Sequence, residues 1–245
     1  MAADPVLVLA LRSALASRAQ PDKAGPMQAY MKSAMPFWGV EAPARRLAVA
    51  AVAAQHPVVD GQVLLETVCE LWHHAARREE RYAALDLLRR PALRQLMDMR
   101  WLPVLHDLIV SGPWWDHNDE VSGQALPWFL QRYPEHVKPV LRQWAHSDQL
   151  WLRRAAMLSQ RGLKAEHFDA VLLYDCILPS TGSSAMAREF FIRKGIGWAL
   201  RERSYAAPDE VQAFCDQYRA QLSPLTLREA LRVIAKDRAR AAVSA

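Results

Sequence analysis

The sequence predicts an all-α protein. Apolar residues recur at every third or fourth position along almost the whole chain, which is the period of an α-helix. No segment shows the alternating pattern of a half-buried strand. Glycine is scarce, at 9 residues, and many of the 15 prolines lie where one helix would end and the next begin. We therefore expect helices of about 10 to 18 residues joined by short turns.

The first twenty residues are apolar but do not resemble a signal peptide. They lack a basic start, carry Asp4 early and are interrupted by Arg12. Asp4 followed by Pro5 is the expected order of an N-cap and a first helical residue, because proline lacks only an N–H group that has no partner there. The sequence predicts a capped amphipathic helix at this end.

Further helices are predicted from local patterns. The helical period is clearest at 63–75, 81–90 and 227–237. We expect 115–131 to form one helix capped by Asp116, and the segment 147–158 to form a helix capped by Ser147 or Asp148. The segment PSTGSSAM, residues 179–186, is small and polar and predicts a flexible loop.

The order of the predicted helices suggests a repeat. Pairs of helices followed by proline recur at roughly 35 to 45 residues, a period that favours HEAT-like antiparallel pairs stacked into an α-solenoid over a closed bundle. The length allows one compact domain or two small ones. We predict a single domain over residues 1–245.

Charge and composition limit the function. The chain has 31 Lys and Arg against 26 Asp and Glu, a formal charge of +5, which favours an anionic partner. Arginine predominates, as expected for phosphate recognition, although GC-rich coding would produce the same bias. Cys69, Cys176 and Cys215 are odd in number and widely spaced, which favours a reducing cytoplasm. No window is long and apolar enough for a membrane span.

Two short segments have unusual combinations of residues for a helix. Trp115 and Asp119 are four residues apart, so on a helix they share a face, and a carboxylate beside an indole needs a cation or several donors opposite it. From spacing alone, Asp119 could simply pair with a neighbouring arginine under a core tryptophan. Gly195 and Gly197 precede Trp198 in a helical pattern, which predicts close approach of another helix or a ligand.

Standard motifs for nucleotide binding, zinc proteases and serine hydrolases are missing from the sequence. His73 and His74 are adjacent, about 100° apart on a helix, and do not converge on one metal as an i, i+4 pair would. These observations disfavour the usual cofactor enzymes and a metal held by this histidine pair.

Six segments in order resemble the AlkD-like DNA alkylation repair glycosylases, and together they cover nearly the whole chain. They are MQAYMKSAMPFWGVEAPARR (27–46), LWHHAARREERYAALDLL (71–88), WWDHNDEV (114–121), WLRRAAML (151–158), EFFIRKGIGWALRE (189–202) and LSPLTLREALRVI (222–234).

The resemblance implies an α-solenoid of HEAT-like repeats with a concave, basic, DNA-binding face. It implies release of cationic alkylated purines, of the N3-alkyladenine and N7-alkylguanine types, from duplex DNA without metal, cofactor or base flipping. The family's catalytic aspartate falls on Asp119, its cleft tryptophans on Trp115 and Trp198, and its backbone-contacting arginine on Arg154. Weaker candidates for DNA contact are Lys32, Arg45, Arg46, Arg193 and Lys194. We expect a cytoplasmic monomer, associated with the nucleoid if bacterial.

The implied chemistry suits one carboxylate. A cationic purine leaves without a general acid, and positive charge then grows on the deoxyribose, where Asp119 would stabilise it and align water. Trp115 and Trp198 would offer π faces to the cation, and Arg154 would hold phosphate. Two other functions stay open: a DNA-binding protein that has lost the chemistry, and a protein-binding scaffold.

Overall fold

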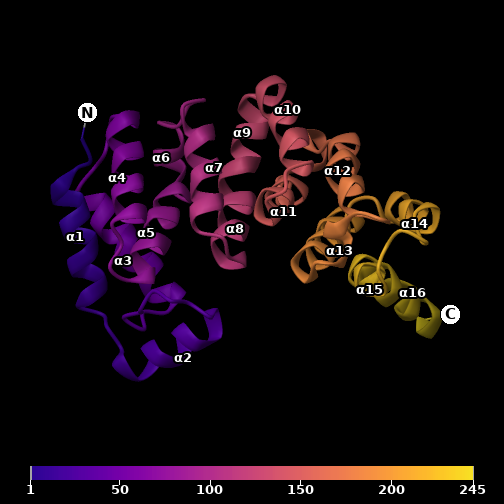
Figure 1. Cartoon of the computed structure of the whole chain (residues 1–245), viewed down its shortest axis with the longest axis horizontal. Helices are drawn as coiled ribbons and strands as arrows, with labels where there is room; N and C mark the ends of the chain where they lie inside the picture. Colours follow the sequence, from indigo (N-terminus) through magenta and orange to yellow (C-terminus); the bar gives the residue numbers. More distant parts are fainter. Residues whose placement is uncertain (1, 245) are drawn as a thin grey trace. The chain divides into compact units, whose positions relative to one another are not determined.

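The expectation of an all-α protein is confirmed. Figure 1 shows the computed structural model, which describes residues 2–244, and within that range there are helices and turns but no strand. Contacts between residues divide the chain into two compact units, Met1–Leu108 and Ile109–Ala245.

The first unit is built from helices that pack side by side around a leucine-rich core. Helix α1 contacts α3, α4 and α5, and α4 packs on α5. The core includes Leu7, Leu11, Leu64, Leu71 and Trp72, all with no exposed surface. The helices are α1 (Pro5–Ala16), α2 (Pro21–Met31), α3 (Ala42–Gln55), α4 (Gly61–His73), α5 (Arg78–Leu88), α6 (Pro91–Arg94) and α7 (Trp101–Ser111), the last of which continues to the second unit.

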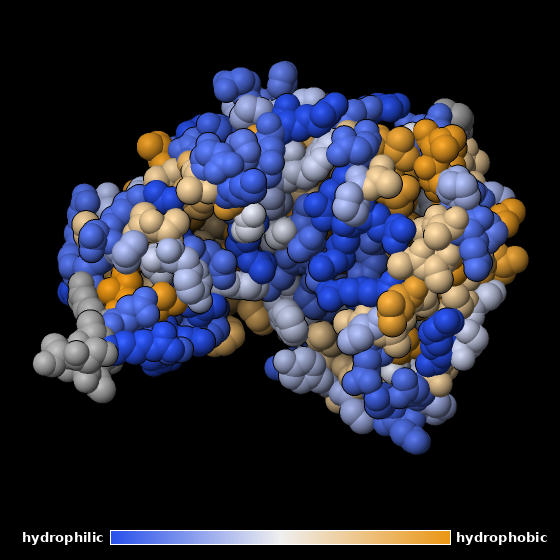
Figure 2. Space-filling view, turned by 180° about the vertical axis from the view of Figure 1, so that it is seen from behind, coloured by the Kyte–Doolittle hydropathy of each residue, from blue (hydrophilic) through white to orange (hydrophobic). Residues whose placement is uncertain are grey.

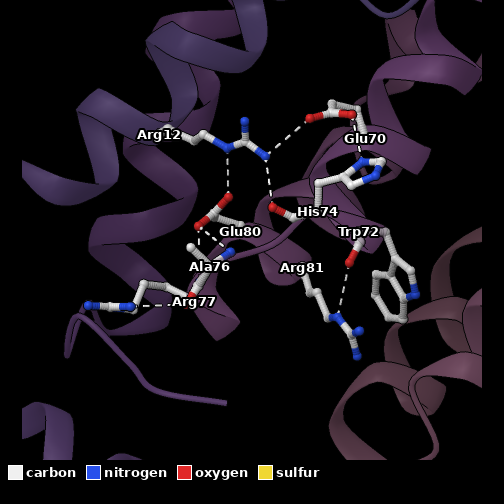
Figure 3. Close-up of polar contacts among 8 residues, drawn as sticks. All are labelled: Arg12, Glu70, Trp72, His74, Ala76, Arg77, Glu80 and Arg81. Carbon is white, nitrogen blue, oxygen red and sulfur yellow. Dashed lines mark hydrogen bonds and ion pairs between the residues drawn. The ribbon is translucent and has the colours of Figure 1, made fainter.

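Two buried glutamates on α5 bind neighbouring segments of this unit. Glu79, which has no exposed surface, accepts hydrogen bonds from the backbone N–H groups of Trp38, Gly39 and Val40. Glu80 accepts from the backbone of the turn before α5 and from Arg12 Nε at 2.7 Å (Figure 3). Buried charges require such partners, so this network is structural.

The second unit contains the remaining helices. Its core includes Leu126, Phe129, Leu141, Leu158 and Leu200, none of which is exposed. Its helices are α8 (Trp115–Glu120), the π-helix η1 (Val121–Ala125), α9 (Leu126–Arg132), α10 (Pro134–Ala145), α11 (Leu150–Leu158), η2 (Ala165–His167), α12 (Ala170–Ile177), η3 (Leu178–Ser180), η4 (Ala185–Arg188), α13 (Phe190–Ser204), α14 (Pro208–Gln217), α15 (Pro224–Ala230) and α16 (Arg232–Ser244).

Several helix starts follow the predicted chemistry. Asp4 caps α1 by accepting from the N–H groups of Val6 and Leu7 at 2.9 and 3.0 Å, and Pro5 is the first helical residue. Helices α2, α6, α10, α14 and α15 also begin with proline. Proline at the first helical position removes no intrahelical hydrogen bond. Prolines therefore mark these helix starts in the sequence.

Two predicted caps are wrong. The helix that begins at Trp115 has Trp114 as its N-cap, and Asp116 Oδ1 instead accepts from the adjacent N–H of His117 at 2.9 Å. The N-cap of α11 is Gln149, whose own N–H donates to Ser147 Oγ. In both cases the polar residue lies one or two positions away from the cap, a shift that pattern alone does not resolve.

The helix predicted at 115–131 is continuous in its helical path but changes type. It runs as α8, then as the π-helix Val121–Ala125, then as α9. The helix predicted at 227–237 is interrupted at Leu231, between α15 and α16. π-helical turns inside α-helices are rare and occur frequently at functional sites.

The segment predicted as a flexible loop, 179–186, is held at its start. Arg153 Nη1 donates to Pro179 O at 2.9 Å and to Ser180 Oγ at 3.2 Å, and Ser180 has no exposed surface. Gly182 takes a positive φ of 60°, and its N–H donates to Gln221 O at 3.1 Å. The first two and the last two residues of the segment belong to short 3₁₀ helices, Leu178–Ser180 and Ala185–Arg188.

The two glycines before Trp198 lie where helices approach closely, as predicted. A Cβ atom at Gly197 would lie 2.6 Å from Glu229 Cβ and 3.1 Å from Thr226 O, both on α15. A Cβ at Gly195 would lie 2.9 Å from Met157 Sδ and 3.1 Å from Arg154 Nη1. Glycine therefore sets the positions of α11 and α15 against α13.

Hydrophilic residues cover most of the face seen in Figure 2, and hydrophobic residues interrupt them in separate patches. No helix among residues 2–244 combines the length and the apolar composition that crossing a membrane requires.

Candidate functional site

Trp115 and Asp119 lie one turn apart on α8, which places them on the same side of the helix as predicted. Both are partly exposed, whereas His117 and Asn118, on the other side, are 1% exposed. Asn118 Nδ2 donates to Trp151 O at 2.7 Å, which ties α8 to α11. The buried side of α8 thus fixes the helix, and its partly open side carries the candidate residues.

Asp119 and Arg154 form a two-pronged ion pair. Arg154 Nε lies 2.9 Å from Asp119 Oδ1, and Arg154 Nη2 lies 2.9 Å from Oδ2. Arg154 Nη1 donates to Phe191 O at 2.6 Å, so one guanidinium joins α8, α11 and α13. The side chains of Arg154 and Asp119 are 5% and 15% exposed. This pairing is the alternative that spacing alone left open.

The position of Arg154 differs from the phosphate-facing arginine that the resemblance implies. Its guanidinium is buried, and its donors point to a carboxylate and a backbone carbonyl. A bidentate arginine fixes the plane of a carboxylate as well as its position. In this structure Arg154 therefore orients Asp119.

The pKa of Asp119 is raised above its ordinary value because burial penalises the charged carboxylate. The guanidinium groups of Arg154 and Arg161 act against this rise, and the charge of Asp116 adds to it. Asp119 is thus a largely buried carboxyl group with two arginines near it. Carboxyl groups with a shifted pKa and specific charged partners occur often at functional sites.

A pocket of about 210 Å³ opens beside this pair, and half of its lining residues are aromatic. Both predicted tryptophans line it, which brings residues far apart in the sequence together. Its lining residues are Trp115, Arg154, Phe190, Phe191, Lys194, Trp198, Arg201 and Glu229. A larger cavity of about 300 Å³ lies elsewhere in this unit, along Gly162–Ala165 and Tyr205, and contains none of the predicted site residues.

Aromatic packing supports the pocket from below. The rings of Trp114, Trp151 and Phe191 lie with centroids 5.1 to 6.0 Å apart, in tilted and edge-to-face pairs. Arg154 lies 6.0 Å from the centroid of Phe191. Phe191 thus joins this aromatic cluster to the ion pair.

Trp198 is held on α13 by two charged side chains. Its Nε1 donates to Glu202 Oε1 at 3.0 Å, one turn further along the helix. Arg161 stacks on the indole, with Cζ 3.6 Å from the ring centroid. The same arginine donates from Nη1 to the backbone carbonyl of Asp119 at 3.4 Å.

Two cations at the pocket rim share one carboxylate. Lys194 Nζ lies 2.9 Å from Glu229 Oε1, and Arg201 Nη1 lies 2.6 Å from Glu229 Oε2. These ion pairs lower the pKa of Glu229 below its ordinary value, with the Lys194 hydrogen bond as the largest cause. Lys194, predicted to contact DNA, is therefore at the site but partly neutralised.

Three other predicted basic residues have separate surroundings. Arg46 Nε lies 3.5 Å from Asp86 Oδ1, and Arg45 Nε binds the second oxygen of Asp86 at 2.7 Å. Lys32 ends α2 in a left-handed backbone conformation, with φ 49° and ψ 39°, and is exposed. These three belong to the first unit, whereas Arg193 lies on α13 in the second.

Sequence reasoning missed several residues of the site. Phe191 and Arg201 share one face of α13 with the predicted residues Lys194 and Trp198, and this helical spacing was visible in the sequence. Arg161 and Glu229 are different, because they come from beyond α11 and from α15, and only tertiary packing brings them near Trp198 and Lys194.

Among residues 2–244, no three His, Cys, Asp or Glu side chains are grouped as ligands of a metal ion. His73 Nε2 lies 2.8 Å from Asp107 Oδ2 and His74 Nδ1 lies 2.7 Å from Glu70 Oε2, so the two imidazoles have different partners.

Comparison with known proteins gives a consistent result. Residues 11–234 match the sequence profile of a family described as "DNA alkylation repair enzyme". Among solved structures, the chain is similar to one described as "Predicted DNA alkylation repair enzyme from Enterococcus faecalis", with a TM-score of 0.76 and 27% sequence identity. That match covers 89% of this chain and 98% of the other. No curated protein matches the sequence.

Proposed function

The chain belongs to the DNA alkylation repair enzyme family, and on that premise we propose that it is a monofunctional DNA glycosylase. Its proposed substrates are cationic alkylated purines, of the N3-alkyladenine and N7-alkylguanine types, in duplex DNA. The observation that supports this most is a carboxylate, Asp119, fixed by Arg154 beside a pocket walled by Trp115 and Trp198.

The proposed reaction needs no proton donor for the leaving group. The bond between the purine nitrogen and C1′ of the deoxyribose breaks, its electron pair goes to the purine, and the cationic base leaves as a neutral molecule. Positive charge then develops on the sugar. Water adds to C1′ and releases a proton, which leaves an abasic site and a free alkylated base.

Asp119 is placed to act on the sugar in this scheme. A carboxylate has about four lone-pair positions, and Arg154 occupies one on each oxygen, which leaves others for a developing cation or a water molecule. Because Arg154 fixes the carboxylate before the substrate arrives, the stabilisation costs little reorganisation at the moment of reaction. The aromatic wall lowers the local dielectric and strengthens the interaction.

Trp115 and Trp198 would contact the damaged nucleotide itself. An indole face attracts a cation by roughly 0.5 to 2 kcal/mol, depending on how much water is excluded. Recognition of positive charge on the base would therefore favour alkylated purines over normal ones. In this proposal the pocket recognises the lesion while the base remains stacked, without a deep cavity for a flipped nucleotide.

The ion pair also favours a second candidate, a DNA-binding protein without catalysis. If Arg154 satisfies Asp119 completely, the pair only holds α8 and α11 together. The two functions differ in one measurable respect, because only the glycosylase converts methylated duplex DNA to abasic sites.

The deciding experiment is an abasic-site assay on duplex DNA containing 7-methylguanine. Wild type should release the base, and Asp119→Asn should lose the activity while keeping most of its DNA affinity. Asp116→Asn, a change of the same kind on the same helix, serves as the matched control and should stay active. The proposal would be contradicted if wild type released no more 7-methylguanine than the protein-free control, or if Asp119→Asn kept full activity. Chelation with EDTA should leave the rate unchanged.

A further inference from the structure

Arg161 has an unusual position at the edge of the proposed site. It follows α11, and its guanidinium stacks on Trp198 with Cζ 3.6 Å from the ring centroid. Its Nη1 donates to the Asp119 backbone carbonyl at 3.4 Å, while its Nε is buried and has no hydrogen-bond partner. Burial of Nε without a partner costs free energy of desolvation, and the side chain nevertheless lies between α8 and α13.

The guanidinium also lies close to the π-helix. A Cβ atom at Gly123 would lie 3.0 Å from Arg161 Nη1 and 3.4 Å from Cζ, so glycine leaves the room that the arginine occupies. Gly123 is the middle residue of Val121–Ala125, where the backbone follows the wider π turn. The guanidinium is therefore close both to the π-helix at Gly123 and to the indole of Trp198.

From this geometry we infer that Arg161 is a positioning residue that holds Trp198 beside Asp119, an inference that rests on the proposed function. Trp198 lines the aromatic pocket, and Arg161 is not among the residues that line it. In this inference the arginine covers one face of the indole, and the face on the pocket side remains for the nucleotide.

Covering one indole face with a cation has a chemical consequence. The ring quadrupole attracts positive charge on both faces, and a guanidinium on one side weakens the attraction for a cation on the other. Trp198 then acts more as a rigid wall than as a cation-binding ring. Trp115 is left as the indole better able to recognise the positive charge of the base.

The same arginine places a second positive charge near Asp119. The charged groups that act on this carboxylate are Arg154 from α11, Arg161 from the segment after α11, and Asp116 on its own helix. Burial raises the pKa of Asp119, and Arg161 partly offsets that rise. Loss of Arg161 should therefore raise the pKa of Asp119 further.

The test uses three variants of the full chain. Arg161→Met removes the charge and keeps an unbranched side chain, and Arg161→Lys restores a charge. Gly123→Ala would place a Cβ 3.0 Å from Arg161 Nη1 and so displace the guanidinium without altering it, and it provides a perturbation if Arg161→Met folds poorly. The matched control is Arg132→Met, because Arg132 Cζ lies 5.7 Å from the ring centroid of Trp128, another arginine and tryptophan contact in the same unit.

The first measurement does not depend on catalysis. Fluorine NMR of protein labelled with 5-fluorotryptophan should give nine resonances, one for each tryptophan, with Trp198 assigned by Trp198→Phe. Arg161→Met and Gly123→Ala should shift the Trp198 resonance, and Arg132→Met should shift that of Trp128 only. A Trp198 resonance that stays in place in both variants would overturn the inference, whether or not the protein is an enzyme.

The second measurement follows Asp119. A carbon-13 carboxyl titration, with the signal assigned by Asp119→Asn, should move to higher pH in Arg161→Met and stay near wild type in Arg161→Lys. The rate of 7-methylguanine release should fall about tenfold in Arg161→Met, most strongly at acidic pH, and recover in Arg161→Lys. An unmoved titration together with an unchanged rate would refute a positioning role. If wild type released no base, the proposed function would fail while both NMR measurements still tested the contact.

Discussion

Arg154 binds both oxygens of Asp119, at 2.9 Å each, in a place where neither side chain is more than 15% exposed. The pair connects α8 to α11, and the remaining Arg154 donor extends the connection to α13. An isolated buried charge would be costly, so the pairing offsets part of the cost of burying these two side chains. The predictions below follow from this pair and its neighbours.

The first prediction concerns pH. Burial raises the pKa of Asp119 above the ordinary value of 3.8, and the proposed reaction needs the ionised form. The rate of base release should therefore fall, as pH decreases, at a higher pH than an ordinary aspartate would give. Single-turnover rates across acidic pH check this, with Asp119→Asn measured in parallel to subtract spontaneous depurination. A rate that stays constant down to the ordinary aspartate range would contradict it.

The second prediction separates two roles of Arg154. Arg154→Lys keeps a positive charge but loses the two-pronged contact with Asp119. We expect a lower rate of base release and an unchanged salt dependence of DNA binding, because the buried guanidinium is directed at Asp119. DNA affinity measured over a range of salt concentrations tests this. If the slope became shallower by about one, Arg154 would contact phosphate as the family resemblance implies.

The third prediction concerns Glu229, which pairs with Lys194 and Arg201 at the pocket rim. Glu229→Gln keeps the size of the side chain and removes its charge. Both cations should then attract phosphate more strongly, which raises affinity for duplex DNA of any sequence and steepens its salt dependence. Fluorescence anisotropy with undamaged DNA measures the effect. Unchanged affinity would mean that neither cation lies near the bound duplex.

The same substitution should change acid stability. The folded protein lowers the pKa of Glu229 below the ordinary value of 4.5, so its ion pairs stabilise the fold above that pH. This contribution is lost as pH falls through the lowered pKa. Glu229→Gln should therefore be less stable than wild type near neutral pH, and the difference should shrink under acid conditions. Urea unfolding at neutral and acidic pH gives the comparison.

The last prediction tests helix packing. Gly197→Ala would bring a Cβ within 2.6 Å of Glu229 Cβ and 3.1 Å of Thr226 O, and we expect a loss of roughly 1 to 3 kcal/mol in unfolding free energy. Gly25→Ala is the matched control, since a Cβ there meets nothing within 4 Å. Alanine in that helix should stabilise by about 0.5 to 1 kcal/mol. Equal thermal shifts for both variants would contradict the close approach.

The sequence predicts features that depend on neighbouring residues. The cap at Asp4, the prolines that begin helices and the shared face of Trp115 and Asp119 all follow from local chemistry. The close approach at Gly197 could also be predicted, because glycine lowers the stability of a helix and is expected inside one mainly where a neighbouring element leaves no room for a side chain.

Features that depend on tertiary contacts could not be predicted in this way. Spacing places Asp119 on a helix face but does not select Arg154 as its partner, because Arg153 is adjacent and instead binds Pro179 and Ser180. The π-helix has no local signature, and the cap at Trp114 has no side-chain hydrogen bond that a motif would reveal.

The π-helix at Val121–Ala125 also determines how this part of the chain tolerates changes in length. A π turn holds about one residue more than an α turn. Removal of one residue here would let an ordinary α-helix run from Trp115 to Arg132 and keep the flanking turns in phase. The shortened chain would keep Asp119 but lose the space at Gly123 that Arg161 occupies. A homologue with a natural deletion at this point would therefore hold the residue equivalent to Trp198 by a different contact.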